Sequence, residues 1–145
     1  LIVESKAGVP VLQECKTTIR EAKAQKLDEL RLYDSSEEVN QFSINKVFGW
    51  FNKSTRVGLA NSINIEREVG RSKTNIWLGD TLFILPIEKA IDMLCQLELY
   101  ALTCYNVTQG HINIINQLET KESIEFYDFR IGYPKKLSFT GYPTL

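Results

Sequence analysis

LELYALTCYNVTQGHINIINQL, residues 97 to 118, carries a regular pattern of apolar and small side chains at intervals of four and three residues. This spacing lies along one face of an α-helix, as in a coiled coil. We call the face the seam and expect it to pack on another helix, either the N-terminal helix or a helix of a second copy. Its two polar members would set the register or the oligomer state of that packing. The seam consists of Leu97, Ala101, Cys104, Thr108, His111, Ile115 and Leu118.

The helix that carries the seam is expected to begin after Pro86 and to run to about Thr120, because proline fits the first turn of a helix. Asn106 and Gly110 are positions where it could bend. Glu98 lies beside the seam, and a carboxylate that is buried there needs a partner such as Arg56.

Two β-hairpins are predicted before the long helix. A shorter helix follows the first hairpin, and the long helix itself follows the second. The first hairpin covers residues 41 to 51 and turns at Asn45-Lys46, and the second covers 74 to 85 and turns at Gly79-Asp80. The intervening helix, residues 53 to 69, would end at Gly70, a residue that suits the left-handed conformation. This β-β-α-β-β-α order resembles a weak internal repeat and predicts an α+β fold.

The N-terminal part is predicted to contain an extended lead-in, residues 1 to 10, and an amphipathic helix over residues 11 to 32. Residues 11 to 145 would form a single α+β domain, with a last strand near 136 to 140. The chain starts with Leu1 rather than Met, so we expect its natural N-terminus to lie upstream.

The composition is that of an ordinary globular protein, with 43% hydrophobic and 24% charged residues and a net charge of −1. The near-neutral charge gives no global attraction for nucleic acid, and no apolar run is long enough to cross a membrane. The three cysteines are an odd number without a CxxC pair, which fits a reducing compartment.

WFNKSTRVGL, residues 50 to 59, contains Lys-Ser-Thr after Gly49 and so invites comparison with a phosphate-binding loop. A Walker loop requires glycine directly before the lysine, where this chain has Asn52. Asn52 is instead a strong candidate for the N-cap of the following helix.

No arrangement for catalysis or metal binding is apparent in the sequence. The spacing of Cys104 and His111 matches no zinc site. A single histidine in a helix seam does not favour a nucleophile–base pair. We therefore expect no enzymatic activity, no cofactor and no metal.

Two alternative binding functions remain open. Trp50, Trp77, Tyr127 and Tyr133 could stack on the sugars of a surface glycan. Arg67, Arg71 and Lys73 could instead contact nucleic acid in a small regulatory protein, although we do not expect this.

Several blocks of the chain resemble a known phage and prophage family, catalogued as domain of unknown function 4376. The blocks are KLDELRLYDSSEEVNQFSIN, WFNKSTRVGLANSI, IWLGD, LELYALTCYNVT and YDFRIGYPKKL. Together they extend over roughly residues 20 to 140. Members of that family often have Asp-Lys-Ala in place of Asn52-Lys53-Ser54, and both triplets supply an N-cap.

The resemblance implies a protein encoded near tail-fibre and tail-assembly genes. We therefore expect a non-enzymatic protein-interaction component of a phage tail or tail-fibre assembly. Its partner would be a tail protein or a second copy in a homo-oligomer. It would be found in the host bacterial cytoplasm or incorporated into the virion, without a membrane anchor.

Overall fold

The computed structural model describes the backbone of residues 8 to 142 and the side chains of residues 18 to 142. The chain forms two compact units, which are described separately. Unit 1 comprises Leu1–Ser36 and Tyr105–Tyr133, and unit 2 comprises Glu37–Cys104 and Pro134–Leu145. Each unit has its own hydrophobic cluster, and the single domain expected over residues 11 to 145 stays a prediction.

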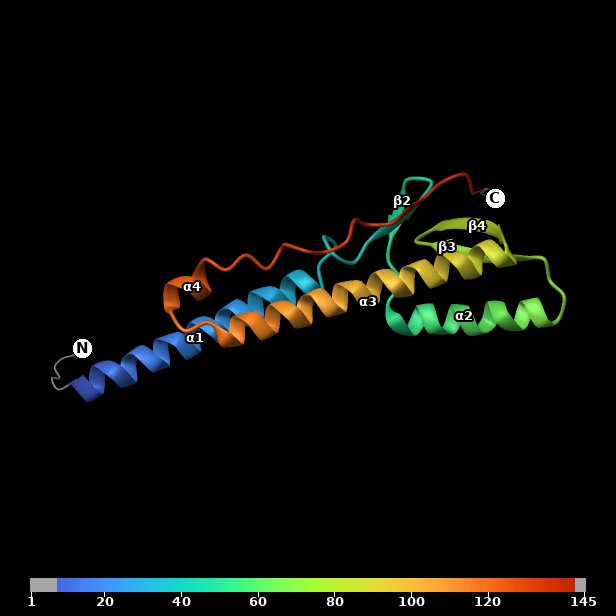
Figure 1. Ribbon diagram of the computed structural model, residues 1–145. Helices are drawn as coiled ribbons and strands as arrows, with labels where there is room; N and C mark the ends of the chain where they lie inside the picture. Colours follow the sequence, from blue (N-terminus) through green and yellow to red (C-terminus); the bar gives the residue numbers. More distant parts are fainter. Residues whose placement is uncertain (1–7, 143–145) are drawn as a thin grey trace. The chain divides into compact units, whose positions relative to one another are not determined.

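Unit 1 is built from helix α1 (Gly8–Asp34), the second part of helix α3 (Ile87–Gln117) and the short helix α4 (Lys121–Glu125) (Figure 1). Its core contains Leu30 from α1, Ile115 from α3 and Phe129 from the segment after α4. The helix predicted for 11 to 32 is confirmed, and it extends further at both ends. Of the predicted lead-in, residues 8 to 10 are helical, which corrects that prediction, and residues 1 to 7 lie outside the described residues.

Helix α4 was not predicted from the sequence. Thr120 caps it, since the Ser123 N–H donates to the Thr120 hydroxyl oxygen at 3.1 Å. A helix of five residues is too short to show a helical period, so only the capping residue could have indicated it.

Unit 2 contains two small sheets, helix α2 (Lys53–Glu68) and the first part of α3. One sheet has the strand order β2-β1-β5, with β1 (Phe42–Ile44) antiparallel to β2 (Val47–Gly49) and parallel to β5 (Ser138–Phe139). The other is the hairpin of β3 (Lys73–Leu78) and β4 (Thr81–Pro86). Both hairpins and the last strand are therefore confirmed.

The turns use the residues that the sequence indicated. Asn45 and Lys46 have φ values of 50° and 67°, the left-handed conformation that a type I′ hairpin turn requires. Gly79 has φ 62° at the tip of the second hairpin. The side-chain amide of Asn45 also holds the C-terminal segment, because it donates to the carbonyl of Tyr142 and accepts from the N–H of Tyr142.

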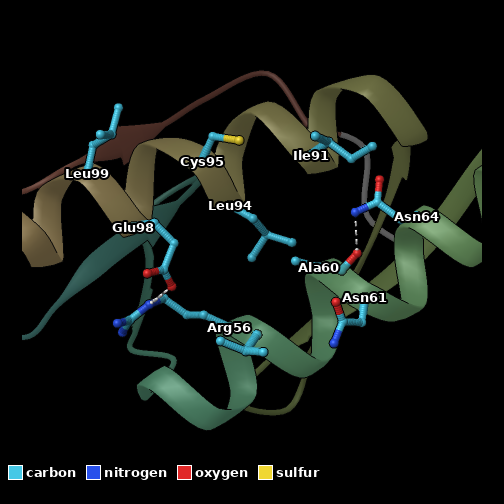
Figure 2. Close-up of a pocket in the computed structure, with 10 residues that line it drawn as sticks. Arg56, Ala60, Asn61, Asn64, Ile91, Leu94, Cys95, Glu98 and Leu99 are labelled. Carbon is cyan, nitrogen blue, oxygen red and sulfur yellow. Dashed lines mark hydrogen bonds and ion pairs between the residues drawn. The ribbon is translucent and has the colours of Figure 1, made fainter.

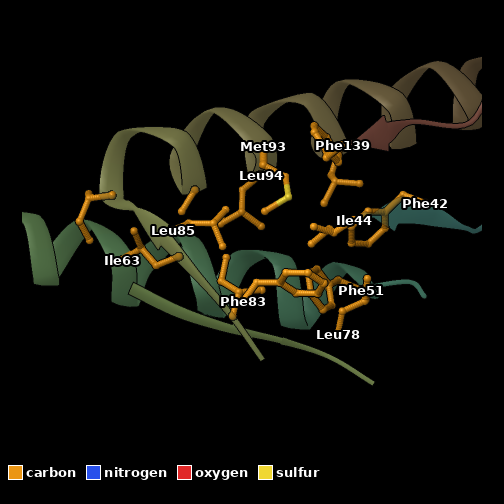
Figure 3. Close-up of a cluster of buried hydrophobic side chains, with 14 residues drawn as sticks. Phe42, Ile44, Phe51, Ile63, Leu78, Phe83, Leu85, Met93, Leu94 and Phe139 are labelled. Atoms are coloured by element: carbon orange, nitrogen blue, oxygen red, sulfur yellow. The ribbon is translucent and has the colours of Figure 1, made fainter. Parts of the chain in front are cut away.

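The core of unit 2 lies between the hairpins, α2 and α3 (Figure 3). Alternate residues of β3 face inward, with Ile76 and Leu78 only 1% exposed, as the period of a strand requires. Met93 and Leu97 enter the same core from α3 and are fully buried. The order of hairpins and helices, and the α+β class, are as the sequence predicted.

Candidate functional site: a groove between α2 and α3

The stretch that resembled a phosphate loop is a strand-to-helix junction. Asn52 caps α2, accepting a hydrogen bond from the Thr55 N–H at 2.9 Å through its side-chain oxygen. Gly49 is explained by packing, because a Cβ at this position would overlap the side chain of Leu78. The predicted N-cap is confirmed.

The seam is buried within the chain, but one helix does not cover all of it. Leu97 belongs to the core of unit 2, among strands and α2 as well as α3. In unit 1, Ile115 packs with Leu30 of α1, as one of the two predicted arrangements required. Cys104, Thr108 and His111 are between 5% and 8% exposed, while Ala101 and Leu118 are half-buried. The prediction that the whole seam packs on one other helix is therefore corrected. Heptad spacing identifies a buried face of a helix, but it does not identify the element that covers that face.

The polar seam residues have partners inside unit 1. The Thr108 hydroxyl donates to the Asp34 carboxylate at 2.7 Å and lies 2.6 Å from the Tyr133 hydroxyl. The Nε2 atom of His111 lies 2.8 Å from the carbonyl oxygen of Ile131. Because a carbonyl oxygen can only accept a hydrogen bond, Nε2 carries a proton. These bonds fill the seam from within the chain, and it is not an open surface for a partner.

The Tyr127 hydroxyl lies 2.6 Å from Nδ1 of His111, the other ring nitrogen. Burial raises the pKa of Tyr127, and the neighbouring Asp128 carboxylate adds to this shift. The neutral phenol therefore donates to His111, and the pair ties the segment after α4 to α3.

The residues considered for other functions are dispersed or occupied. Among the residues whose side chains are described, no three His, Cys, Asp or Glu side chains lie close enough to hold a metal ion. Trp77 is 59% exposed, whereas Trp50 packs against Phe42, Tyr100 and the guanidinium of Arg56. The two tryptophans thus differ in environment, since Trp50 is half-buried among these groups and Trp77 is exposed.

Two of the three basic residues considered for nucleic acid are engaged with acids. Arg67 lies 3.4 Å from Glu88, and Arg71 lies 3.0 Å from Glu66. The Glu66 carboxylate also accepts a hydrogen bond from the Thr74 hydroxyl at 2.6 Å. The Thr74 hydroxyl and then Arg71 lower the pKa of Glu66. Glu66 is therefore ionised, and its negative charge offsets the positive charge of Arg71.

An apolar groove of about 560 Å³ lies between α2 and α3 in unit 2 (Figure 2). Leu94 points into the space between the helices and forms its floor. Leu99 and Val57, on its two walls, are 64% and 46% exposed. Its apolar lining is completed by Ala60, Ile91 and Cys95.

An arginine–glutamate pair joins the two helices near each end of the groove. Arg56 of α2 donates to Glu98 of α3 through Nε, and Arg67 of α2 lies 3.4 Å from Glu88 of α3. Because the residue numbers run in opposite directions, the two helices are antiparallel here. The pairs hold α2 and α3 together while leaving the apolar surface between them uncovered.

The two ion pairs differ strongly in environment. The Arg56 side chain is only 7% exposed, donates a second hydrogen bond to the Phe51 carbonyl at 2.7 Å and lies over the ring of Trp50. Arg67 and Glu88 are 49% and 74% exposed. Arg56 is therefore a structural residue. Its pairing with Glu98 is the one that the sequence analysis considered for a buried Glu98.

The sequence did contain a signal for the groove. Ile91, Cys95 and Leu99 follow one another at spacings of four residues along α3, which defines a second apolar stripe beside the seam. A helix with two apolar stripes needs cover on two sides. Within unit 2, Leu97 of the seam is buried, whereas Cys95 and Leu99 of the second stripe are exposed, so the second stripe is the one that lacks cover.

No protein-family model, curated protein or solved structure matches this chain. The resemblance to the phage family therefore stays a prediction. Within the described residues, no helix combines the length and the hydropathy that crossing a membrane would require.

Proposed function

We propose that the protein is a non-enzymatic interaction protein that binds a helical segment of a partner protein in the groove between α2 and α3. The observation that supports this most directly is the exposed apolar lining of the groove, above all Leu99 at 64% and Val57 at 46% exposure. A hydrophobic groove between two helices is a recurrent receptor for amphipathic helices. Its volume of about 560 Å³ also lies in the range of true binding sites.

The wider context of this binding is proposed from the sequence resemblance. The blocks between residues 20 and 140 resemble a phage and prophage family associated with tail-fibre and tail-assembly regions. The partner would then be a tail or tail-fibre component, and the chain would act in the host cytoplasm during assembly or remain in the virion. The groove replaces the seam as the proposed surface, because the seam is filled from within the chain.

The composition of phage particles tests this proposal. Particles should be purified from a host whose prophage encodes either the original chain or Leu99→Lys, and their proteins measured by quantitative mass spectrometry. The lysine places a charge in the apolar groove, so we expect the chain or a fibre protein to fall at least ten-fold in abundance.

Leu102→Lys is the matched control for this experiment. Leu102 is 54% exposed on the same helix but does not line the groove. It should leave particle composition unchanged. Identical particles from the original chain and from Leu99→Lys would contradict the proposed function.

A further inference from the structure

The groove has a charged margin on its α3 side. Glu88, Asp92 and Glu98 follow one another along this part of the helix. The exposed Asp92 shares one helical row with Cys95 and Leu99, at spacings of three and seven residues, and both of those residues line the groove. Carboxylates therefore accompany the exposed apolar side chains of this wall.

The two arginines of α2 do not use up this acidic margin. Asp92 lies between the two ion pairs along α3, and the bond described for it is the one from the Gln96 amide at 2.8 Å. Glu98 receives Arg56 on Oε1, and its side chain is still 45% exposed. Lys89 lines a different hollow together with Lys73, on another side of α3.

The length of the groove fits a short helix. The two ion pairs are separated by eleven residues on α2 and ten on α3, which corresponds to about 16 Å of helix. Three helical turns cover this distance and present apolar anchors at positions i, i+4 and i+7.

We propose that the groove selects a basic amphipathic helix, in which apolar anchors enter between α2 and α3 while flanking lysines or arginines pair with Asp92 and Glu98. This deepens the proposed function and rests on it. The apolar lining supplies most of the contact, and the acidic margin favours basic partners over acidic ones and sets the orientation of the bound helix.

Two synthetic peptides test the charge preference on the full chain. Both are 14-residue helices with leucine at the same four positions, and lysine in one is replaced by glutamate in the other. Binding is measured by fluorescence anisotropy. Alkylation of Cys95, followed by peptide-resolved mass spectrometry, reports whether the peptide occupies the groove, because Cys95 is exposed and lines it.

We expect the lysine peptide to bind at least ten-fold more tightly than the glutamate peptide at low salt and to slow alkylation of Cys95. The preference should shrink in 1 M salt, where the charges are screened. Asp92→Asn should reduce the preference about three-fold. Asp80→Asn, at the exposed tip of the second hairpin, should not, and Leu99→Lys should abolish binding of both peptides.

The remaining outcomes separate the inference from the function on which it rests. Equal affinities with protected Cys95, or tighter binding of the glutamate peptide, would overturn the basic preference and leave the groove as a protein-binding site. No binding of either peptide would overturn both. A dimer by light scattering in which Cys95 is already protected would identify a second copy as the occupant and overturn the basic-partner proposal.

Discussion

Arg56 is a side chain whose three contacts come from α3 and from the segment between β2 and α2. Its guanidinium meets the Glu98 carboxylate of α3, the Phe51 carbonyl before α2 and the indole of Trp50 after β2. A guanidinium suits such a site because it is planar and carries several donors in a fixed arrangement. Arg56 thus joins the edge of the groove to the core of unit 2.

Replacement of Glu98 by glutamine should destabilise unit 2, because it leaves the buried Arg56 without its carboxylate. We expect a loss of about 1–2 kcal/mol in the free energy of unfolding, less than for a fully buried pair since Glu98 is partly exposed. Urea denaturation followed by tryptophan fluorescence would measure it. Glu88→Gln, in the exposed pair with Arg67, should cost less than about 0.5 kcal/mol, and equal losses for the two variants would contradict this view of Arg56.

Glu66 should make the protein sensitive to acid. The Thr74 hydroxyl and then Arg71 lower the pKa of Glu66 in the folded state relative to the unfolded chain. Its stabilising contribution is therefore present above the unfolded pKa and is lost as the pH falls through the folded pKa. We expect Glu66→Gln to lose less stability than the original chain between about pH 5 and pH 3. Parallel stability curves from urea unfolding over this range would show that Glu66 is not involved.

At the level of elements, α2 shows how local signals fix a helix at both ends. Asn52 caps its start, and Gly70 follows its end with φ 90°. The Gly70 N–H donates to the backbone carbonyl of Arg67, and the Arg71 N–H donates to the backbone carbonyl of Glu66. These are the paired hydrogen bonds of a Schellman motif. These bonds satisfy carbonyl groups that the helix leaves open.

Loss of the N-cap should weaken α2 by a predictable amount. Asn52→Ala removes the acceptor for the Thr55 N–H, and we expect it to cost about 1 kcal/mol of unfolding free energy. Asn52→Asp keeps an acceptor and should stay within a few tenths of a kcal/mol of the original chain. Thermal unfolding monitored by circular dichroism would compare the two, and an alanine variant as stable as the aspartate variant would argue against the cap.

Elements governed by their own residues could be predicted from the sequence, and surfaces governed by remote contacts could not. Asn45-Lys46 and Gly79 fixed both hairpin turns because left-handed conformations favour few residue types. The seam was recognised as buried, but its cover could not be, since Leu97 and Ile115 have the same spacing and enter different cores. The groove was missed because the stripe of Ile91, Cys95 and Leu99 is indistinguishable, in sequence, from a second buried face.

At the level of the whole molecule, α3 supplies residues to both hydrophobic cores. Met93 and Leu97 belong to the core of unit 2, whereas Ile115 belongs to that of unit 1. The helix continues through Asn106 and Gly110, where a bend was considered from the sequence. The question that follows is whether the two cores unfold together or one at a time.

We predict that each core can be weakened separately, because the two clusters share no residue. Leu30→Ala and Phe83→Ala each create a cavity at a fully buried position and should cost about 2–5 kcal/mol in their own unit. The chain provides a reporter for each unit, since both tryptophans lie in unit 2 and the single histidine, His111, lies in unit 1. In urea, Leu30→Ala should shift the transition seen by the His111 NMR signal more than the tryptophan transition, and Phe83→Ala should do the reverse. If both variants shift the two signals equally, the units unfold as one cooperative structure, and the single domain expected from the sequence is the better description.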